Sequence, residues 1–186
     1  MHTLYCVLGR TSSGKSEVTK RVAEKLNMNI LKSYTTRKMR ESETENNADH
    51  IFIYPDDVEQ YKNDMVAYTE RVGYCSFATK QQVMESDFYI INPSGYYELK
   101  DKLKDCDVRI VSIYITAPYS TILERAKKRG DFAIWKDNYD AETKEFEIFK
   151  NSNDIDFYVL NDTEIEYAVD KMIHVIEKDI KHTQGE

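Results

Sequence analysis

A glycine-rich segment near the amino terminus carries the strongest chemical signal in the sequence. Gly9-Arg-Thr-Ser-Ser-Gly14-Lys15-Ser16 fits the pattern G-x-x-x-x-G-K-[ST], in which the backbone N–H groups of a tight loop surround a chain of phosphates. Glycine at positions 9 and 14 permits backbone angles, and a close approach to the anion, that a side chain would block. The pattern predicts that Lys15 contacts the β- and γ-phosphates of a nucleoside triphosphate and that the Ser16 hydroxyl coordinates Mg²⁺.

The loop lies between two segments that can position it. Leu4–Leu8 has the composition of a buried strand, and apolar residues such as Val18 and Val22 recur at helical spacing up to about Asn27. A strand, a glycine loop and a helix in this order are the context that the phosphate-binding pattern requires. The context argues against an ordinary glycine turn of purely structural role.

A second basic segment follows the loop. Ser33-Tyr-Thr-Thr-Arg37-Lys-Met-Arg40 places two arginines three residues apart behind several hydroxyl groups. Such a set can present planar donor forks to one phosphate, although a basic stretch is also typical of a solvated loop. Because it follows a phosphate-binding loop, we interpret it as a clamp for a second, acceptor phosphate.

The remaining pattern predicts an α/β fold, with a parallel sheet covered by helices. Strands are predicted at 88–91, 108–115 and 157–160, with helices between them and a last helix from about Ile165 to Ile176. Residues 33–82 are polar and rich in tyrosine, which indicates an insertion of short strands and loops. A second insertion, residues 125–151, is dense in charge and is predicted to move as a flap.

Composition limits the classes of function. A length of 186 residues predicts one domain, and 26 basic against 33 acidic residues argue against nucleic acid as a partner. No signal-peptide pattern and no run of about 18 apolar residues occurs, so we expect no membrane partner and a cytoplasmic location. The three cysteines are too few and too widely spaced to suggest disulfides or a zinc site.

The sequence resembles the guanylate kinase family, whose members carry the phosphate-binding loop (P-loop) followed by S-x-T-T-R-x-x-R and D-Y-x-F. Asp49-His50-Ile51-Phe52 is similar to the last of these motifs, and Phe77-Ala78-Thr79 is similar to the family's Y-G-T. Arg125-Ala-Lys-Lys-Arg129-Gly130 resembles R-L-x-x-R-G, and the segment 156–162 resembles Y-D-x-V-I-x-N-D. The resemblance therefore covers most of the chain.

The resemblance implies three parts and a set of site residues. They are a core that holds ATP and Mg²⁺ (1–32, 83–124 and 152–186), an acceptor-binding arm (33–82) and a lid (125–151). The catalytic residues it implies are Lys15, Arg37, Arg125 and Arg129, with Ser16 on the metal. The implied ATP site consists of Gly9, Arg10, Thr11, Ser12, Ser13, Gly14, Lys15, Ser16 and Asn161. The implied acceptor site consists of Ser33, Arg37, Arg40, His50, Tyr68, Glu70, Thr79 and Asn92.

The sequence departs from the family at the positions that read guanine. Counting back from Thr79 puts Tyr68 where the family has an arm glutamate, with Glu70 two residues away. The family's strand ending in D-x-D-x-x-G appears here with Ile90 and Asn92 in place of its two aspartates. Since an amide both donates and accepts hydrogen bonds, we expect selectivity for guanine to be weaker than usual or shifted to another base.

The lid also departs from the family. A second lid arginine is expected about ten residues after Gly130, where this chain has Asp140, and Lys136 and Lys144 are the candidate substitutes.

Three functions are consistent with these observations. The first is a nucleoside monophosphate kinase with small-molecule nucleotides as partners and GMP or dGMP as first acceptors. The second is a kinase of the same fold that uses another phosphorylated acceptor, such as another nucleotide or ribose 1,5-bisphosphate. The third is a non-catalytic interaction module, although such modules tend to lose the P-loop lysine, which is present here as Lys15. The sequence leaves the oligomeric state open.

Overall fold

The computed structural model describes residues 1–39, 43–45, 48–71, 73–130 and 132–185. Its main sheet has four parallel strands in the order β6-β1-β7-β8. Their bounds are β1 (His2–Leu8), β6 (Phe88–Ile90), β7 (Val108–Thr116) and β8 (Phe157–Leu160). Parallel strands need crossover connections, and helices supply them here. The predicted α/β fold and parallel sheet are confirmed.

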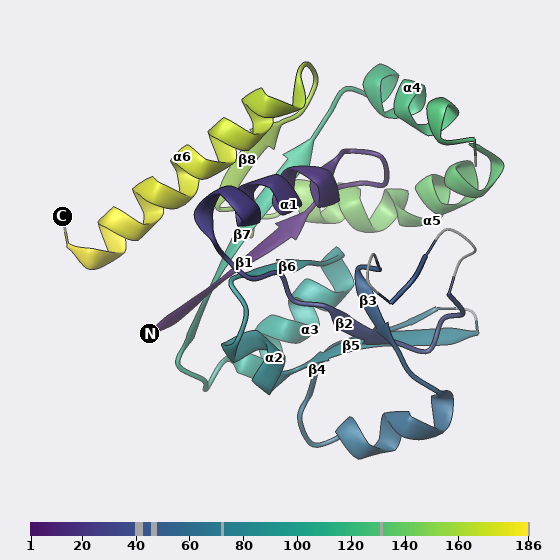
Figure 1. Ribbon diagram of the computed structural model, residues 1–186, viewed down its shortest axis with the longest axis vertical. Helices are drawn as coiled ribbons and strands as arrows, with labels where there is room; N and C mark the ends of the chain where they lie inside the picture. The colour runs from purple at the N-terminus through teal and green to yellow at the C-terminus, as the bar shows by residue number, and fades with distance from the viewer. Residues whose placement is uncertain (40–42, 46–47, 72, 131, 186) are drawn as a thin grey trace.

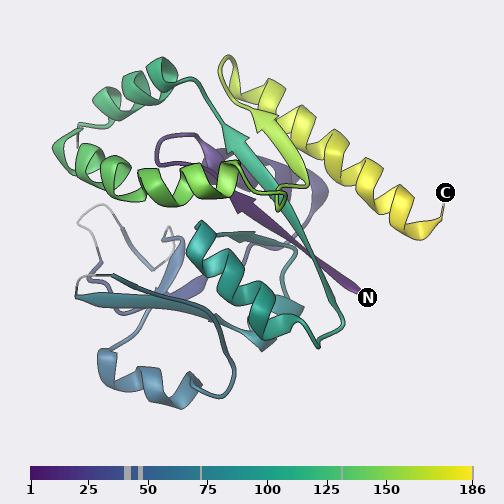
Figure 2. The ribbon, with the colours of Figure 1, turned by 180° about the vertical axis from the view of Figure 1, so that it is seen from behind.

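Helices cover both faces of this sheet (Figures 1 and 2). On one face lie α1 (Lys15–Leu26) and α6 (Ile165–Gln184), and on the other lie α3 (Pro93–Leu103) and α5 (Phe132–Lys150). Successive side chains of β1 point to opposite faces of the sheet, so β1 contributes to both cores. Tyr5 and Val7 join the core beneath α1 and α6, whereas Leu4, Cys6 and Leu8 join the core beneath α3 and α5.

A second sheet is built from the insertion that follows α1. Its strand order is β3-β2-β5-β4, with β2 and β3 parallel and the other neighbours antiparallel. The bounds are β2 (Ser33–Thr35), β3 (His50–Phe52), β4 (Met65–Arg71) and β5 (Tyr74–Thr79), with the 3₁₀ helix η1 (Pro55–Tyr61) and α2 (Lys80–Met84) beside them. Figure 1 shows this unit below the main sheet. Its inner residues Val66, Ala67 and Ala78 share the core cluster of α3.

The charge-dense segment forms two helices. α4 (Tyr119–Arg129) and α5 pack through a small cluster in which Ile122, Ala126 and Trp135 are buried. The second half of α5 differs, because Phe146 and Phe149 are buried in the core beneath α3. Only the first half of α5 therefore packs separately from the main core. Among the described residues, no helix is long and apolar enough to cross a membrane.

Candidate active site

The P-loop joins the end of β1 to the start of α1, as the sequence predicts. Gly14 is the N-cap of α1 and has a φ of 87°, a left-handed conformation that glycine adopts without strain. A Cβ at Gly14 would lie 2.2 Å from Nδ2 of Asn161, and one at Gly9 would lie 2.4 Å from the carbonyl oxygen of Ile115. The two glycines are therefore required by close packing of the loop.

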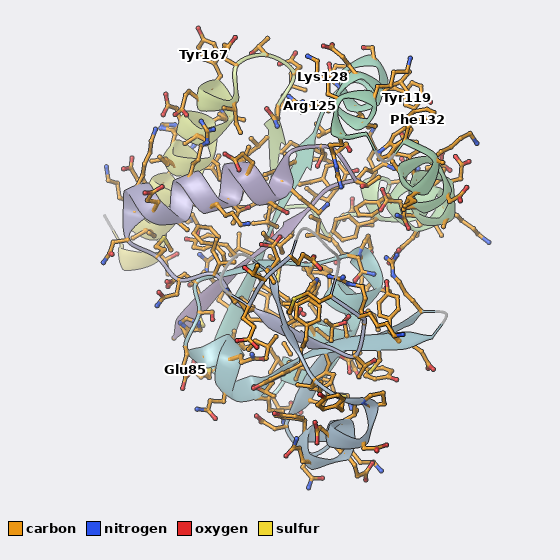
Figure 3. All side chains as sticks on the ribbon, turned by 45° about the vertical axis from the view of Figure 1, so that its right-hand side comes forward. Glu85, Tyr119, Arg125, Lys128, Phe132 and Tyr167 are labelled. Carbon is orange, nitrogen blue, oxygen red and sulfur yellow. The ribbon has the colours of Figure 1, made fainter. Side chains whose placement is uncertain are left out.

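Two side chains hold the loop from outside. Nδ2 of Asn161 donates to the carbonyl oxygen of Ser13 at 2.8 Å, and the guanidinium of Arg125 donates to the same oxygen at 3.2 Å. Arg125 also donates to Oδ1 of Asn161 at 3.3 Å. Figure 3 labels Arg125 on α4, and burial lowers its pKa. Both residues thus contact the P-loop, but neither lines the main cavity.

A cavity of about 630 Å³ lies beside the P-loop. Its wall combines Lys15 and Ser16 with residues of the second sheet and with the inner face of α5. Burial is the main cause that lowers the pKa of Lys15; Arg129 and Arg71 add to the lowering, and Glu142 opposes it. Burial thus disfavours the charged form of Lys15, and an anion bound in this cavity would favour that form again.

The loop offers unsatisfied donors that suit a phosphate chain. The hydroxyl groups of Ser12 and Ser13 are buried and have no hydrogen-bond partner among the described residues, and Ser12 has a φ of 62°. Phosphate oxygens would accept from such hydroxyl and backbone N–H groups.

The metal site predicted at Ser16 can be tested against its surroundings. Ser16 faces the main cavity, and the described residues contain no group of three histidine, cysteine or acidic side chains that could hold a metal alone. These donors fit Mg²⁺ held by one hydroxyl and by phosphate oxygens, because Mg²⁺ prefers a few protein ligands together with phosphates and water.

A second cavity of about 250 Å³ lies against the second sheet and the end of β6. Ser33, His50, Arg71, Tyr74 and Asn92 are among the residues that line both cavities. The two cavities therefore share a wall.

Arg37 lines the second cavity and already binds a carboxylate. Its two terminal nitrogens donate to the two oxygens of Glu43 at 2.9 Å each. A carboxylate is a planar anion that a guanidinium binds much as it binds phosphate, so a phosphate at Arg37 would compete with Glu43 for the same two donors. Its predicted neighbour Arg40 lies outside the described residues.

His50 and Ser33 form a pair between the two cavities. Oγ of Ser33 lies 2.9 Å from Nδ1 of His50. Burial and then the charge of Arg37 lower the pKa of His50. The imidazole is therefore neutral at neutral pH and can act as both donor and acceptor toward a ligand.

Asn92 lines both cavities, but its amide is engaged. Oδ1 accepts from the backbone N–H of Gly95 at 3.2 Å, which caps α3, and Nδ2 donates to Oγ of Ser94 at 2.9 Å.

The predicted acceptor residues Tyr68, Glu70 and Thr79 line neither the main cavity nor the second cavity. β4 has a bulge between Val66 and Thr69, and a bulge shifts the alternation of side chains by one residue. Thr69 consequently lines the second cavity, while Tyr68 and Glu70 are exposed.

Thr79 has a local structural role. Its hydroxyl accepts from the backbone N–H of Gln82 at 3.2 Å and caps α2.

Several lining residues are absent from the sequence predictions, among them Asn138, Glu142 and Arg71. Asn138 and Glu142 lie one turn apart on α5 and line the main cavity together with Phe146, four residues further on. Arg71 lines both cavities from the end of β4. Helical spacing within the charged segment is the signal that could have found the first two. The bulge that helps to place Arg71 has no clear sequence signal.

Glu142 contacts the P-loop directly. Its Oε1 accepts from the backbone N–H of Thr11 at 2.7 Å and lies 3.7 Å from Nε of Arg10. Burial raises the pKa of Glu142, and the hydrogen bond from Thr11 opposes this effect. A lid carboxylate thus binds an N–H group that the P-loop pattern assigns to phosphate.

The candidate lysines of the lid lie elsewhere. Lys136 pairs with Asp140 at 2.8 Å on the exposed side of α5, and neither Lys136 nor Lys144 lines a described cavity.

Known proteins resemble this chain in sequence and in fold. A guanylate kinase of Fusobacterium nucleatum is 29% identical over 193 residues, which cover 96% of this chain and 97% of that protein. A guanylate kinase structure from Anaplasma phagocytophilum has a TM-score of 0.65 at 17% identity and covers 96% of this chain and 86% of its own. An uncharacterized protein from Eubacterium ventriosum has a TM-score of 0.53 at 16% identity, covering 96% and 99%.

No family model matches the sequence. The sequence match runs along nearly the whole of both proteins, and together with the shared fold it makes this chain similar to guanylate kinases.

Proposed function

We propose that this chain is a nucleoside monophosphate kinase that transfers the γ-phosphoryl group of Mg-ATP to an acceptor nucleotide. The observation that carries the proposal is a P-loop cavity that shares a wall with a second cavity containing Arg37. Transfer between two phosphates requires two adjacent anion sites in line. The guanylate kinase relatives support the same class of reaction.

In the proposed reaction each part of the site has one task. Lys15 and the P-loop N–H groups bind the donor phosphates, and Arg37 orients the acceptor phosphate. Mg²⁺, held by Ser16 and phosphate oxygens, would neutralise charge on the donor phosphates. No general base is needed, because an acceptor phosphate is ionised at neutral pH. Of the two predicted lid arginines, Arg125 donates to the P-loop carbonyl of Ser13, and Arg129 adds positive charge near Lys15.

GMP and dGMP are the first acceptors to test, since the relatives are guanylate kinases. Two carboxylates, Glu43 and Asp49, line the second cavity, and they are paired with Arg37 and Lys20 respectively. Thr69 and Ser76 supply hydroxyl groups in the same wall. Such groups both donate and accept hydrogen bonds, so they favour weak selectivity among bases.

An ADP-release assay with Mg-ATP tests the proposal. The acceptors are the common ribo- and deoxyribonucleoside monophosphates together with ribose 1,5-bisphosphate. We expect transfer to at least one nucleotide, with kcat/KM for GMP less than about a thousandfold above the next base, or about 4 kcal/mol of discrimination. A larger preference for GMP would contradict weak selectivity. Activity on ribose 1,5-bisphosphate alone would exclude a nucleotide acceptor, and no transfer at all would favour a non-catalytic module.

A further inference from the structure

Arg71 has a position that no other described cation shares. Lys15, Lys20, Lys32 and Arg71 line the main cavity, whereas the cations of the second cavity are Arg37 and Arg71. Among the described residues, Arg71 is thus the one cation that faces both the P-loop side and the arm side. It reaches this wall from the end of β4, where it pairs with Tyr74 across the β4–β5 hairpin.

Several other cations near the cavities already have partners. Arg37 binds Glu43, Lys20 binds Asp49 at 2.7 Å, and Arg125 binds the carbonyl of Ser13. Within the described part of the chain, the side chain of Arg71 forms no hydrogen bond and no ion pair, so its guanidinium fork is available to a ligand. Its charge acts at the P-loop, because it lowers the pKa of both Lys15 and Glu142.

Among the described residues, α5 does not provide an equivalent cation to the main cavity. The residues of α5 that line the main cavity are Asn138, Glu142 and Phe146, which include a carboxylate and no basic side chain. A phosphoryl group in transit spreads negative charge over its equatorial oxygens and needs cations beside it. A planar guanidinium can contact two of those oxygens at once.

We propose that Arg71 is a further catalytic residue, which contacts the phosphoryl group as it passes between the P-loop cavity and the second cavity. This inference rests on the proposed kinase function. Under this inference, Arg71 of the second sheet supplies positive charge to the transferring group in addition to the predicted lid arginines.

Steady-state kinetics of four proteins test the inference, with the best acceptor from the nucleotide panel. They are the natural protein, Arg71→Gln, Arg71→Lys and the control Lys62→Gln. Lys62 lies at the end of η1 on the same insertion and pairs with Glu59, away from both cavities. We expect Arg71→Gln to lower kcat by about a hundredfold or more, since loss of a charge-stabilising donor has effects of this order.

The pattern across the variants separates catalysis from structure. We expect KM for ATP to change by less than about threefold in Arg71→Gln, partial recovery of kcat in Arg71→Lys, and unchanged kinetics in Lys62→Gln. Thermal melts report folding, and Arg71→Lys keeps the test informative if the glutamine variant unfolds. An Arg71→Gln enzyme within threefold of the natural kcat would overturn the role of Arg71 alone. Absence of transfer by the natural protein would overturn both the function and this inference.

Discussion

At the scale of single residues, the P-loop combines groups that are poorly satisfied in the protein alone. Lys15 has a lowered pKa because of burial, and the hydroxyl groups of Ser12 and Ser13 have no partner among the described residues. Lys15 lines the main cavity, so a phosphate chain bound there as proposed would favour the charged form of Lys15 that burial disfavours. Ser12 and Ser13 do not line this cavity.

We expect Lys15→Ala to lower kcat by several orders of magnitude and to leave the fold intact, because the variant removes a donor-phosphate charge without altering the apolar core. Turnover in the ADP-release assay and the melting temperature measure the two effects. Near-normal turnover in a folded Lys15→Ala protein would exclude the P-loop from the mechanism.

At the scale of elements, α5 presents a carboxylate to the loop that the proposal assigns to phosphate. Glu142 accepts from the N–H of Thr11. Its negative charge also acts on Lys15, because it is the largest of the effects that oppose the lowering of the lysine pKa. Donor phosphates would compete with this carboxylate for the same N–H group. Under the proposed function, Glu142 on α5 would therefore compete with ATP for this N–H group.

We expect Glu142→Gln to bind Mg-ATP about fivefold more tightly or better, because the amide removes a negative charge next to the phosphates. Isothermal titration calorimetry measures the affinity. Asp137→Asn is the matched control, since Asp137 is an exposed carboxylate on the same helix that lines none of the three cavities. Equal affinity in Glu142→Gln and the natural protein would show that the carboxylate does not compete.

The same variant has a predicted pH dependence. Burial raises the pKa of Glu142 in the folded protein above its unfolded value of about 4.3. The folded protein therefore binds more protons than the unfolded protein between these two pKa values, and its stability falls as the pH rises through that interval. We expect melts of Glu142→Gln to match those of the natural protein near pH 4 and to exceed them above the folded pKa. An advantage that did not change with pH would contradict this account.

At the scale of the whole molecule, the three parts meet around one cavity. The P-loop, the second sheet and α5 all contribute to its lining. Two sets of contacts hold α5, one to the P-loop and one to the start of α3. Arg10 lies 3.4 Å over the ring of Tyr139 and donates to the carbonyl of Tyr139 and the hydroxyl of Thr143, and Glu145 accepts from the backbone N–H of Ser94 at 2.6 Å. The position of α5 thus depends on contacts with both the P-loop and α3.

We expect Arg10→Ala to loosen the first half of α5 and to leave the second half protected. The substitution removes a cation–π contact of about 0.5–2 kcal/mol and two hydrogen bonds from a charged group, whereas Phe146 and Phe149 stay buried. Hydrogen exchange followed by mass spectrometry should show faster exchange, by about tenfold or more, in residues 132–143 only. Unchanged exchange there would show that Arg10 does not hold the lid.

Local pattern was sufficient for the fold and for the geometry of the P-loop. Strand 157–160 has the bounds that its apolar run predicts, and α1 begins at Lys15 as the P-loop pattern requires. These features depend on neighbours in the chain: the period of apolar residues, and glycines at positions where a Cβ would collide. The same is true of the parallel sheet, which follows from alternating strands and helices.

Tertiary structure decided which residues line the second cavity. The bulge after Val66 turns Thr69 inward and leaves Tyr68 and Glu70 exposed, because one extra residue reverses the side-chain alternation that counting along a strand assumes. The packing of α5 likewise brings Glu142 to the P-loop across more than a hundred residues of sequence. The sequence by itself determined the elements and the phosphate-binding loop, since these arise from local periodicity and sterics. Only the packing of the second sheet and α5 against the core decided which side chains face the second substrate, since that depends on contacts between segments far apart in the chain.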